Sequence, residues 1–191
     1  MNKAENHEVV SIYTLDDDVR EAMLLEQKEC VLNWCTQDDW PMGVIHSYIW
    51  RKGSIWITAA AHRHRVSALR RNPKSSVVIT SKGTSLDAGK SITIKGRAKI
   101  HDDKDLKEWF YPELASALRS TPEEVKAFED MLDSPLRIVI EVVPEKWITY
   151  DGAKMRAHTL GTIDESKLAK PLEADTVRLA AEKERRGLSH D

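Results

Sequence analysis

Residues 90–102, KSITIKGRAKIHD, alternate between small or apolar side chains and mostly polar ones, and no other segment restricts the fold so strongly. Successive side chains of an extended strand point to opposite faces, so a spacing of two predicts a strand with one buried face. The buried side is expected to consist of Ile92, Ile94, Gly96, Ala98 and Ile100.

Five further segments are short, apolar and rich in residues that favour strands. A tight hairpin is expected at Gly53, and Pro144 predicts a bulge or bend. Because these strands follow one another with few helices between them, they favour a closed antiparallel barrel over a parallel α/β sheet. We predict a mainly β fold (β+α), a six-stranded antiparallel barrel with flanking helices, whose other strands are 29–36, 41–50, 54–61, 75–82 and 136–151.

Helical spacing of apolar residues interrupts the strands at four places. Thr121 and Glu124 form the sequence pattern of a capping box, and Pro122 suits the first position of a helix. Pro73 ends the helix that precedes it. The helices are therefore predicted at 15–27, 62–72, 103–120 and 121–132.

The chain divides into three parts by composition. Residues 1–14 are polar without a clear period and are expected to form a flexible arm. Residues 15–156 carry the strands and form the barrel domain. Residues 157–191 are a polar C-terminal tail, in which 173–187 have the composition of a helix with a thin apolar stripe.

Composition excludes several classes of protein. Of the 191 residues, 41% are hydrophobic and 31% charged, which is typical of a globular chain, and the net charge of −2 argues against a general polyanion binder. No segment resembles a signal peptide or a membrane span. Cys30 and Cys35 lie five residues apart on one strand, so they face opposite sides and cannot form a disulfide. Free thiols suit a reducing compartment, and we expect a cytoplasmic protein.

Residues 62–74, HRHRVSALRRNPK, concentrate positive charge in a chain that is slightly acidic overall. His62 and His64 diverge on a helix and have no carboxylate or thiol at ligand spacing nearby, so no metal site is predicted. A nucleic-acid arm is an alternative, although no recognised nucleic-acid motif accompanies the cluster. The segment 84–91 ends in Gly-Lys-Ser but lacks the first glycine and the helix of a P-loop.

A more specific interpretation concerns the first half of this segment. Strand 54–61 leads directly into the N-terminus of helix 62–72, where unpaired backbone N–H groups favour an anion. His64 and Arg65 lie in the first turn, where cations oppose the helix dipole unless an anion is bound. We therefore predict a site for one phosphate group. Arg70 and Arg71 are expected to lie on a solvated face.

From residue 41 to 79 the sequence resembles the pyridoxamine-phosphate-oxidase-like split-barrel flavoproteins. The shared features are Pro41, the hairpin at Gly53, a basic residue seven positions before Asn72-Pro73, which is Arg65, and an apolar strand after it. The resemblance continues through ITIKGRAKI to Trp147 and covers about residues 20–155. It implies a split barrel that assembles as a homodimer and binds FMN between the subunits, and an oxidoreductase acting on a small organic molecule.

The resemblance also implies roles for individual residues. Arg63, His64 and Arg65 would hold the cofactor phosphate, while Thr58 and Ala59 would line the ribityl chain. Ser91 would reach the polar edge of the ring, and Trp147 and Arg156 would contact the flavin from the same or the other subunit. The segment beside the isoalloxazine ring would be Val44, Ile45, His46 and Ser47, and His46 is the candidate for catalytic proton transfer.

Alternatives remain open at this point. Gly43 stands where pyridoxamine phosphate oxidase itself has an arginine, so the broader group fits better than vitamin-B6 oxidation. A deazaflavin could bind at the same turn in place of FMN, and FAD or haem are further cofactor alternatives. The protein could also bind flavin or haem without turnover, or bind nucleic acid through 62–74. Apolar strand residues such as Val44 and Trp147 are often ordinary core residues.

Overall fold

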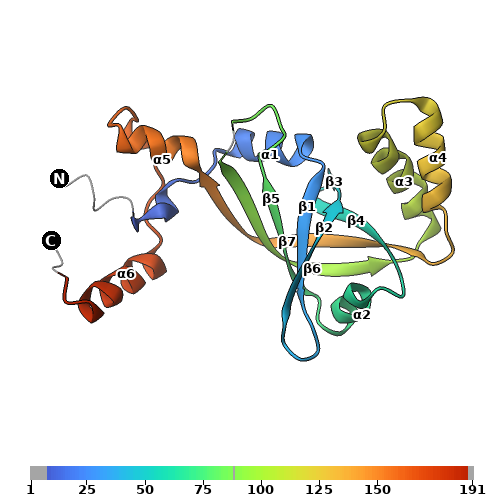
Figure 1. Ribbon diagram of the computed structural model, residues 1–191, viewed down its shortest axis with the longest axis horizontal. Helices are drawn as coiled ribbons and strands as arrows, with labels where there is room; N and C mark the ends of the chain where they lie inside the picture. Colours follow the sequence, from blue (N-terminus) through green and yellow to red (C-terminus); the bar gives the residue numbers. More distant parts are fainter. Residues whose placement is uncertain (1–7, 88, 189–191) are drawn as a thin grey trace.

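The alternating segment forms β6 (Lys90–His101), which lies in the middle of a curled antiparallel sheet (Figure 1). The computed structural model describes residues 8–87 and 89–188. The strand order is β2-β1-β5-β6-β7-β4-β3, and every neighbouring pair is antiparallel. The other strands are β1 (Glu29–Cys35), β2 (Pro41–Ser47), β3 (Ile49–Arg51), β4 (Ser54–Ala60), β5 (Lys74–Thr80) and β7 (Arg137–Asp151).

The predicted face of β6 is confirmed. Ile92 and Ile94 are fully buried, Gly96 and Ala98 are buried, and Ile100 is half-buried, whereas the residues between them are half-buried or exposed. The sheet curls around this face into a half-barrel, so that the inward side chains of several strands share one core.

The described residues form seven strands rather than six, because the predicted strand 41–50 divides at Tyr48. Ser47 pairs with Glu29, the first residue of β1, and the Tyr48 N–H then donates to the carbonyl of Lys28, which precedes β1, at 3.2 Å. Ile49 begins a new pairing with Trp56 of β4. The Tyr48 side chain turns into the core, where its hydroxyl donates to the Leu24 carbonyl at 3.0 Å.

The irregularity predicted at Pro144 is present as a shift in the β6–β7 register. Gly96 pairs with Pro144 and Lys95 pairs with Lys146, which leaves Glu145 as an extra residue on β7. Such a bulge lets proline occupy a long central strand, because a proline nitrogen cannot donate to the ladder.

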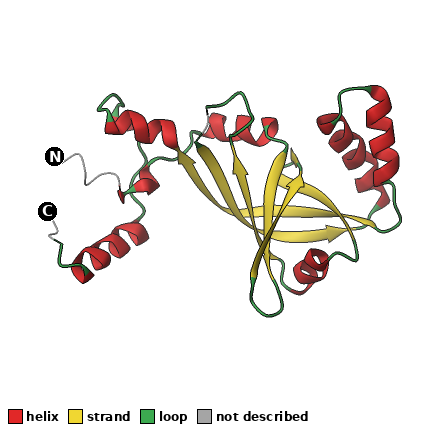
Figure 2. Cartoon of the chain, viewed as in Figure 1, coloured by secondary structure: helices red, strands yellow, loops and turns green. Residues whose placement is uncertain are grey.

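Six α-helices lie within the described residues, and Figure 2 shows them around the sheet. The capping box of Thr121 and Glu124 is formed as predicted. Helices α3 and α4 pack on the outer side of β3 and β4 around a second core that includes Phe110 and Trp56. The helices are α1 (Asp17–Glu26), α2 (His64–Arg71), α3 (Lys104–Leu118), α4 (Pro122–Leu132), α5 (Gly152–Thr159) and α6 (Glu173–Arg185). None has the length and apolar character needed to cross a membrane.

Part of the segment expected to be a flexible arm is held against the end of the sheet. Tyr13 is fully buried, its carbonyl accepts from the Asp151 N–H at 2.8 Å, and its hydroxyl lies 2.8 Å from His158 Nδ1. A short 3₁₀ turn, Val10–Ile12, precedes it, and the Ile12 carbonyl accepts from Ala169 N–H. The first seven residues of the predicted arm lie outside the described residues.

The C-terminal tail contains more structure than its composition indicated. Helix α5 follows β7 directly because the Asp151 carboxylate caps its first N–H groups. A 3₁₀ turn, Glu165–Lys167, connects it to α6, which has no buried residue and stands away from the sheet (Figure 1). Both cysteines are free; Cys30 is buried, which raises its pKa to about 12, and Cys35 is exposed.

The close approach of β6 and β7 at the bulge makes Gly96 sensitive to substitution. A Cβ at position 96 would lie 2.4 Å from the Val143 carbonyl oxygen, a rigid backbone atom. We expect Gly96→Ala to lower the free energy of unfolding by about 2 kcal/mol, the range of overpacked core sites. Urea denaturation measures this loss, and Lys95→Ala on the neighbouring exposed position is the control. Equal stability of the two variants would contradict the packing argument.

Candidate functional site

The basic segment folds at the junction between β4 and α2. Arg63 is the N-cap residue in an extended conformation, and no side chain caps the helix. Val66 and Leu69 are buried and fix α2 against the sheet, while His64 and Arg65 occupy the first turn. The uncapped N–H groups and the nearby cations make this turn attractive for an anion.

Arg65 is half-buried and is the least satisfied cation of this turn. Its Nε atom is buried and has no hydrogen-bond partner among the described residues. Burial lowers the pKa of the guanidinium, and the positive charge of Arg63 lowers it further. An arginine remains protonated under these conditions, and Arg65 forms no ion pair with another of the described residues.

His46 on β2 lies within the field of Arg65. Its Nε2 atom is buried and also has no partner among the residues that the structure describes. Burial, together with the charge of Arg65, lowers the pKa of His46 to about 4. The imidazole is therefore neutral near pH 7. The structure thus brings together three predicted site residues, His46, Arg63 and Arg65.

His64 belongs to a different neighbourhood. The pKa of the exposed Asp38 carboxyl is lowered first by a hydrogen bond from Thr36, and also by the charges of His64 and Arg71. Asp38 lies in the turn between β1 and β2, so His64 faces this acidic turn. The turn thus supplies a counter-charge to His64 that Arg65 lacks.

The four predicted residues of β2 do not share one face. Val44 packs against the core, and His46 points to the same side, because side chains alternate along a strand. Ile45 and Ser47 point outward, and Ile45 is 64% exposed. A planar ring can therefore contact the side chains of Val44 and His46 on one face, or those of Ile45 and Ser47 on the other. It can contact the backbone of all four residues from either face.

The two predicted residues of β4 have structural contacts. Ala59 is buried in the main core. Thr58 Oγ1 donates to the Ile138 carbonyl across the β4–β7 pair at 2.9 Å. Both residues lie near the end of β4, a few positions before α2 begins at His64. Their backbone therefore runs toward the first turn of α2, where Arg65 lies.

Ser91, Trp147 and Arg156 lie at another part of the molecule. Trp147 lies in the second half of β7, ten residues after Arg137, which pairs with Ala60 just before the Arg65 turn. Ser91 pairs with Tyr150 near the end of β7, and Arg156 lies on α5. Figure 1 shows α5 and α2 at opposite ends of the sheet.

Trp147 has partners of its own that the sequence did not indicate. Its ring meets Trp50 edge to face with centroids 5.8 Å apart, and the Arg20 guanidinium lies 5.1 Å from its centroid. Arg20 comes from α1, and no sequence motif links it to β7. Only the tertiary packing of α1 on the sheet brings the two together.

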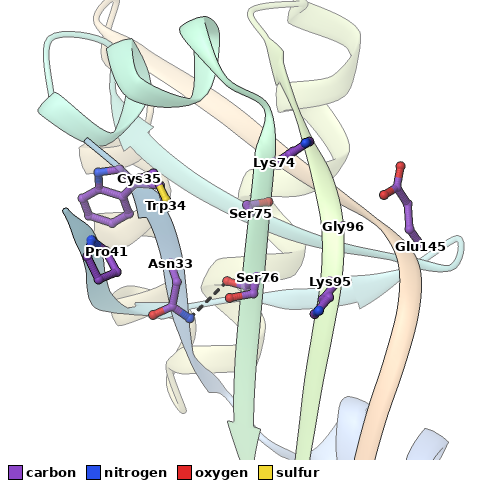
Figure 3. A pocket seen from close by; sticks show the side chains of 10 residues that line it. All are labelled: Asn33, Trp34, Cys35, Pro41, Lys74, Ser75, Ser76, Lys95, Gly96 and Glu145. Atoms are coloured by element: carbon purple, nitrogen blue, oxygen red, sulfur yellow. Dashed lines mark hydrogen bonds between the residues drawn. The ribbon is translucent and has the colours of Figure 1, made fainter. Parts of the chain in front are cut away.

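A cavity of about 340 Å³ is the other hollow of interest, and none of its residues was predicted as a site residue (Figure 3). Four strands besides β2 contribute to it, each with one to three residues, so no linear motif marks it. At its edge, the Asn33 amide donates to the Ser76 carbonyl, and Asn33 Oδ1 fills the space where Gly43 would carry a Cβ. No group of three or more metal-ligating side chains was found within the described residues.

The comparisons with known proteins agree with this fold. The family model described as pyridoxamine 5′-phosphate oxidase matches residues 15–151. None of the curated proteins compared with the chain matches it. A conserved hypothetical protein from Mycobacterium tuberculosis has 16% identity and a TM-score of 0.64, covering 86% of this chain and 97% of that one.

Other solved structures of the same fold have names that mention different cofactors. An F420 reductase has 17% identity and a TM-score of 0.51, with 66% of this chain and 94% of that one covered. A FAD-binding protein from Mesorhizobium loti has 18% identity and a TM-score of 0.55, with coverages of 72% and 94%. A haem storage protein from Vibrio cholerae has 15% identity and a TM-score of 0.55, with coverages of 71% and 95%. At these identities the likeness establishes the fold alone.

The low pKa of His46 predicts how stability depends on pH. Between pH 6.5 and 4 the unfolded chain binds a proton at this histidine while the folded chain does not, so the free energy of unfolding falls as the pH falls. Because the ring is partly exposed, we expect His46 to contribute roughly 1–2 kcal/mol to this loss. His46→Gln should flatten the curve of unfolding free energy against pH, measured by urea denaturation.

Met42→Gln, at an exposed position of the same strand without a titratable side chain, is the matched control for this experiment. Its curve should remain parallel to that of the unmodified protein. Parallel curves for His46→Gln as well would show that the imidazole is accessible to water and to protons in the folded state.

Proposed function

The chain belongs to the pyridoxamine 5′-phosphate oxidase family, and we propose that it is an FMN-dependent oxidoreductase acting on a small organic molecule. The observation that carries the proposal is a pair of buried nitrogens, Arg65 Nε in the first turn of α2 and His46 Nε2 on β2, whose pKa is lowered by burial and by the Arg65 charge. A buried polar atom without a partner costs about 1–3 kcal/mol, and more when it is charged. A phosphate group removes this cost, because its oxygens accept from both side chains.

The residues present therefore fit a phosphorylated cofactor. Arg65 provides a forked donor for the phosphate oxygens, Arg63 adds a second positive charge, and the uncapped N–H groups of α2 complete the site. We assign His46 to the same phosphate, where Nε2 carries the proton and donates it in a hydrogen bond. This assignment replaces the predicted role of His46 as a proton donor to substrate.

The flavin, when bound, supplies the transfer of hydride or electrons. The protein residues position it: Thr58 and Ala59 set the course of the backbone toward the phosphate turn, and β2 offers the main chain of Val44 to Ser47 along the ring. Ile45 and Ser47 supply the outward side chains. His64, opposite Asp38, is left out of the phosphate site.

We further propose that the protein is a homodimer. Arg65 follows Ala60, which pairs with Arg137 at the start of β7, whereas Ser91, Trp147 and Arg156 lie at the other end of β7 and on α5; a second subunit would bring its copies to the site. The outer face of the sheet supports this: cross-strand neighbours Ile45, Val31, Val78, Thr93 and Ile148 form one row, whose end residues Ile45 and Ile148 are 64% and 45% exposed. Exposed apolar rows of this kind mark interfaces.

Other cofactors define the alternatives. A deazaflavin reductase is the second candidate, since the F420 reductase shares the fold and a deazaflavin also carries a phosphate. Binding of flavin or haem without turnover is a third, with the haem storage protein as its structural counterpart. Nucleic-acid binding is least favoured, because Asp38 offsets part of the 62–74 cluster and the net charge is −2. The proposed location is the cytoplasm, where the two free thiols remain reduced.

The phosphate assignment predicts unequal effects of two arginines. Arg65→Ala should weaken FMN binding by roughly 10–100-fold, the loss of a charge-assisted hydrogen bond worth about 1.5–3 kcal/mol. Arg71→Ala, whose side chain donates to the Cys35 carbonyl at the other end of α2, should change it less than about threefold. Flavin fluorescence quenching measures both constants. Equal losses of FMN affinity in the two variants would show that Arg65 does not bind the phosphate.

The visible spectrum and thermal stability of the purified protein separate the cofactor alternatives. FMN is expected to give a flavin absorption band and to raise the melting temperature, as ligands of the native state do. A shift with deazaflavin or haem alone would select the corresponding alternative. A protein that responds to none of the three would end the cofactor proposal.

The dimer proposal predicts a matched pair of outcomes. Ile45→Glu places a charge on the outer row and should raise the dimer dissociation constant by at least about tenfold. Val177→Glu changes a residue that is equally exposed, at 63%, but lies on α6 away from the sheet, and should have no effect. Sedimentation velocity over a range of concentrations measures both. A monomer in the unmodified protein would exclude the shared site.

A further inference from the structure

The cavity of Figure 3 opens where β1 and β5 separate. Their pairing ends at Asn33 and Ser76, and the next residues, Trp34 and Ser75, pair with β2 and β6 respectively. The gap leaves a hollow of about 340 Å³, a volume within the range of small-molecule sites. Trp34 belongs to the main core and closes the gap from the inner side.

The side chains at the opening come from the outer face of the sheet. Residues directly opposite each other in an antiparallel pair share a face, and the pairing runs from Asn33 through Ser76 and Lys95 to Lys146. We call these four residues the polar row. Each lies two positions along its strand from a member of the outer apolar row that ends at Ile148, so the two rows point to the same side.

Like charges face each other across the strands at this place. Lys95 on β6 lies opposite Lys146 on β7, and Lys74 on β5 lies opposite Arg97 on β6. The Cβ atoms of opposite residues are only about 4.5–5.5 Å apart, and like charges in such pairs are destabilising. Two neighbouring pairs of cations are therefore a cost to the free protein, which an anion bound between them would relieve.

Ion pairs leave most of this charge uncompensated. The acidic residue of the cavity lining, Glu145, is paired through Oε1 with Arg97 Nε at 2.6 Å. Lys74, Lys95 and Lys146 take part in no ion pair between described residues. In Figure 3, Lys74 and Lys95 lie between the strand that carries Asn33 and the one that carries Glu145. Two of the three unpaired ammonium groups thus line the cavity itself.

The type of cation favours a phosphate group over a carboxylate. The fork of an arginine suits a carboxylate best, and Arg97 already has Glu145 as its partner. Lysine binds phosphate as a point charge. A phosphate monoester carries a charge of about −1.5 to −2 near pH 7 and offers three acceptor oxygens, enough for two ammonium groups and the Ser76 hydroxyl.

We propose that this cavity is a second ligand site, which takes a small organic phosphate monoester. The phosphate accepts from Lys74, Lys95 and Ser76 Oγ, and Lys146 adds its charge from the neighbouring strand. The organic part extends toward Pro41, which lines the other side of the gap.

The site does not depend on the flavin proposal. The polar row lies on the outer face of the sheet, whereas Arg65 lies in the first turn of α2, a helix whose Val66 and Leu69 are packed into the main core. The two sites therefore use different residues from different elements.

Calorimetric titration with phenyl phosphate tests the site, using protein saturated with FMN in a buffer free of phosphate. We expect one saturable site per chain. Lys74→Ala and Lys95→Ala should each raise the dissociation constant by about fivefold or more. Lys82→Ala removes the same charge just beyond the far end of β5 and should leave the constant within about twofold. Equal effects of Lys82→Ala and Lys95→Ala would overturn the site.

Phenyl sulfate tests the charge of the ligand, because it has the shape of phenyl phosphate with a single negative charge. It should bind at least about tenfold more weakly. The second pKa of a phosphate monoester is about 6, so affinity for phenyl phosphate should fall as the pH is lowered through this value, while that for phenyl sulfate should not. Equal affinities near pH 7 would contradict a site for a doubly charged group.

Lys146→Glu separates a binding site from a merely solvated face. It places a carboxylate opposite Lys95, so the melting temperature of the ligand-free protein should rise. The same change should weaken binding of phenyl phosphate at least about tenfold. A gain in melting temperature with unchanged binding would show that the repulsion serves no ligand, and the proposal would be wrong.

Other occupants give different outcomes. Binding of phenyl phosphate in the absence of FMN but not in its presence would make the cavity the flavin's own phosphate site and exclude a second one. If the protein binds no FMN at all, the same titration decides the proposal by itself. A dimer dissociation constant that changes in Lys95→Ala while phenyl phosphate affinity does not would assign the row to a second copy of the chain. Tighter binding of a single-stranded oligonucleotide, lost in Lys95→Ala, would assign it to nucleic acid.

Discussion

The pairing of β6 with β7 is the interaction on which the rest of the structure depends. Twelve residues of β6 pair with β7, more than in any other strand pair, and the same strand pairs with β5 on its other edge. The backbone N–H and C=O groups of β6 form hydrogen bonds to a neighbouring strand on each edge. The strand can therefore bury a row of apolar side chains without leaving buried amide groups unpaired. The curl of the sheet around that row creates the core, and α2 closes one end of it.

The strands and caps that rest on local patterns could be predicted from sequence. The alternation in β6, the capping box at Thr121 and the bulge at Pro144 all depend on residues close together in the chain. The division at Tyr48 could not be predicted, because it depends on where β1 begins, some twenty residues earlier. The same holds for the attachment of Tyr13 to His158, which are 145 residues apart.

The candidate site likewise has one part that local sequence predicts and another that only the tertiary fold determines. The position of Arg65 in the first turn of a helix could be predicted, since it depends on neighbouring residues alone. Its closeness to His46, and the separation of His64 toward Asp38, come from the way β2 and the β1–β2 turn fold back on α2. Arg65 Nε, His46 Nε2, Trp34 Nε1 and Ser75 Oγ are all buried without a hydrogen-bond partner in the described part of the chain, so each leaves hydrogen-bonding capacity unused.

The alternation of β2 has a consequence for how such a protein can evolve. Even-numbered residues of this strand, such as Val44, face the core side and odd-numbered residues face the outer surface, so substitutions can change one surface and leave the other intact. An insertion or deletion of a single residue has no such freedom. It would exchange the two faces along the remainder of the strand, placing Ile45 in the interior and His46 on the surface. We therefore expect selection to preserve the number of residues in β2 more strictly than the type of each residue. Homologues should differ in this strand by substitutions rather than by insertions or deletions.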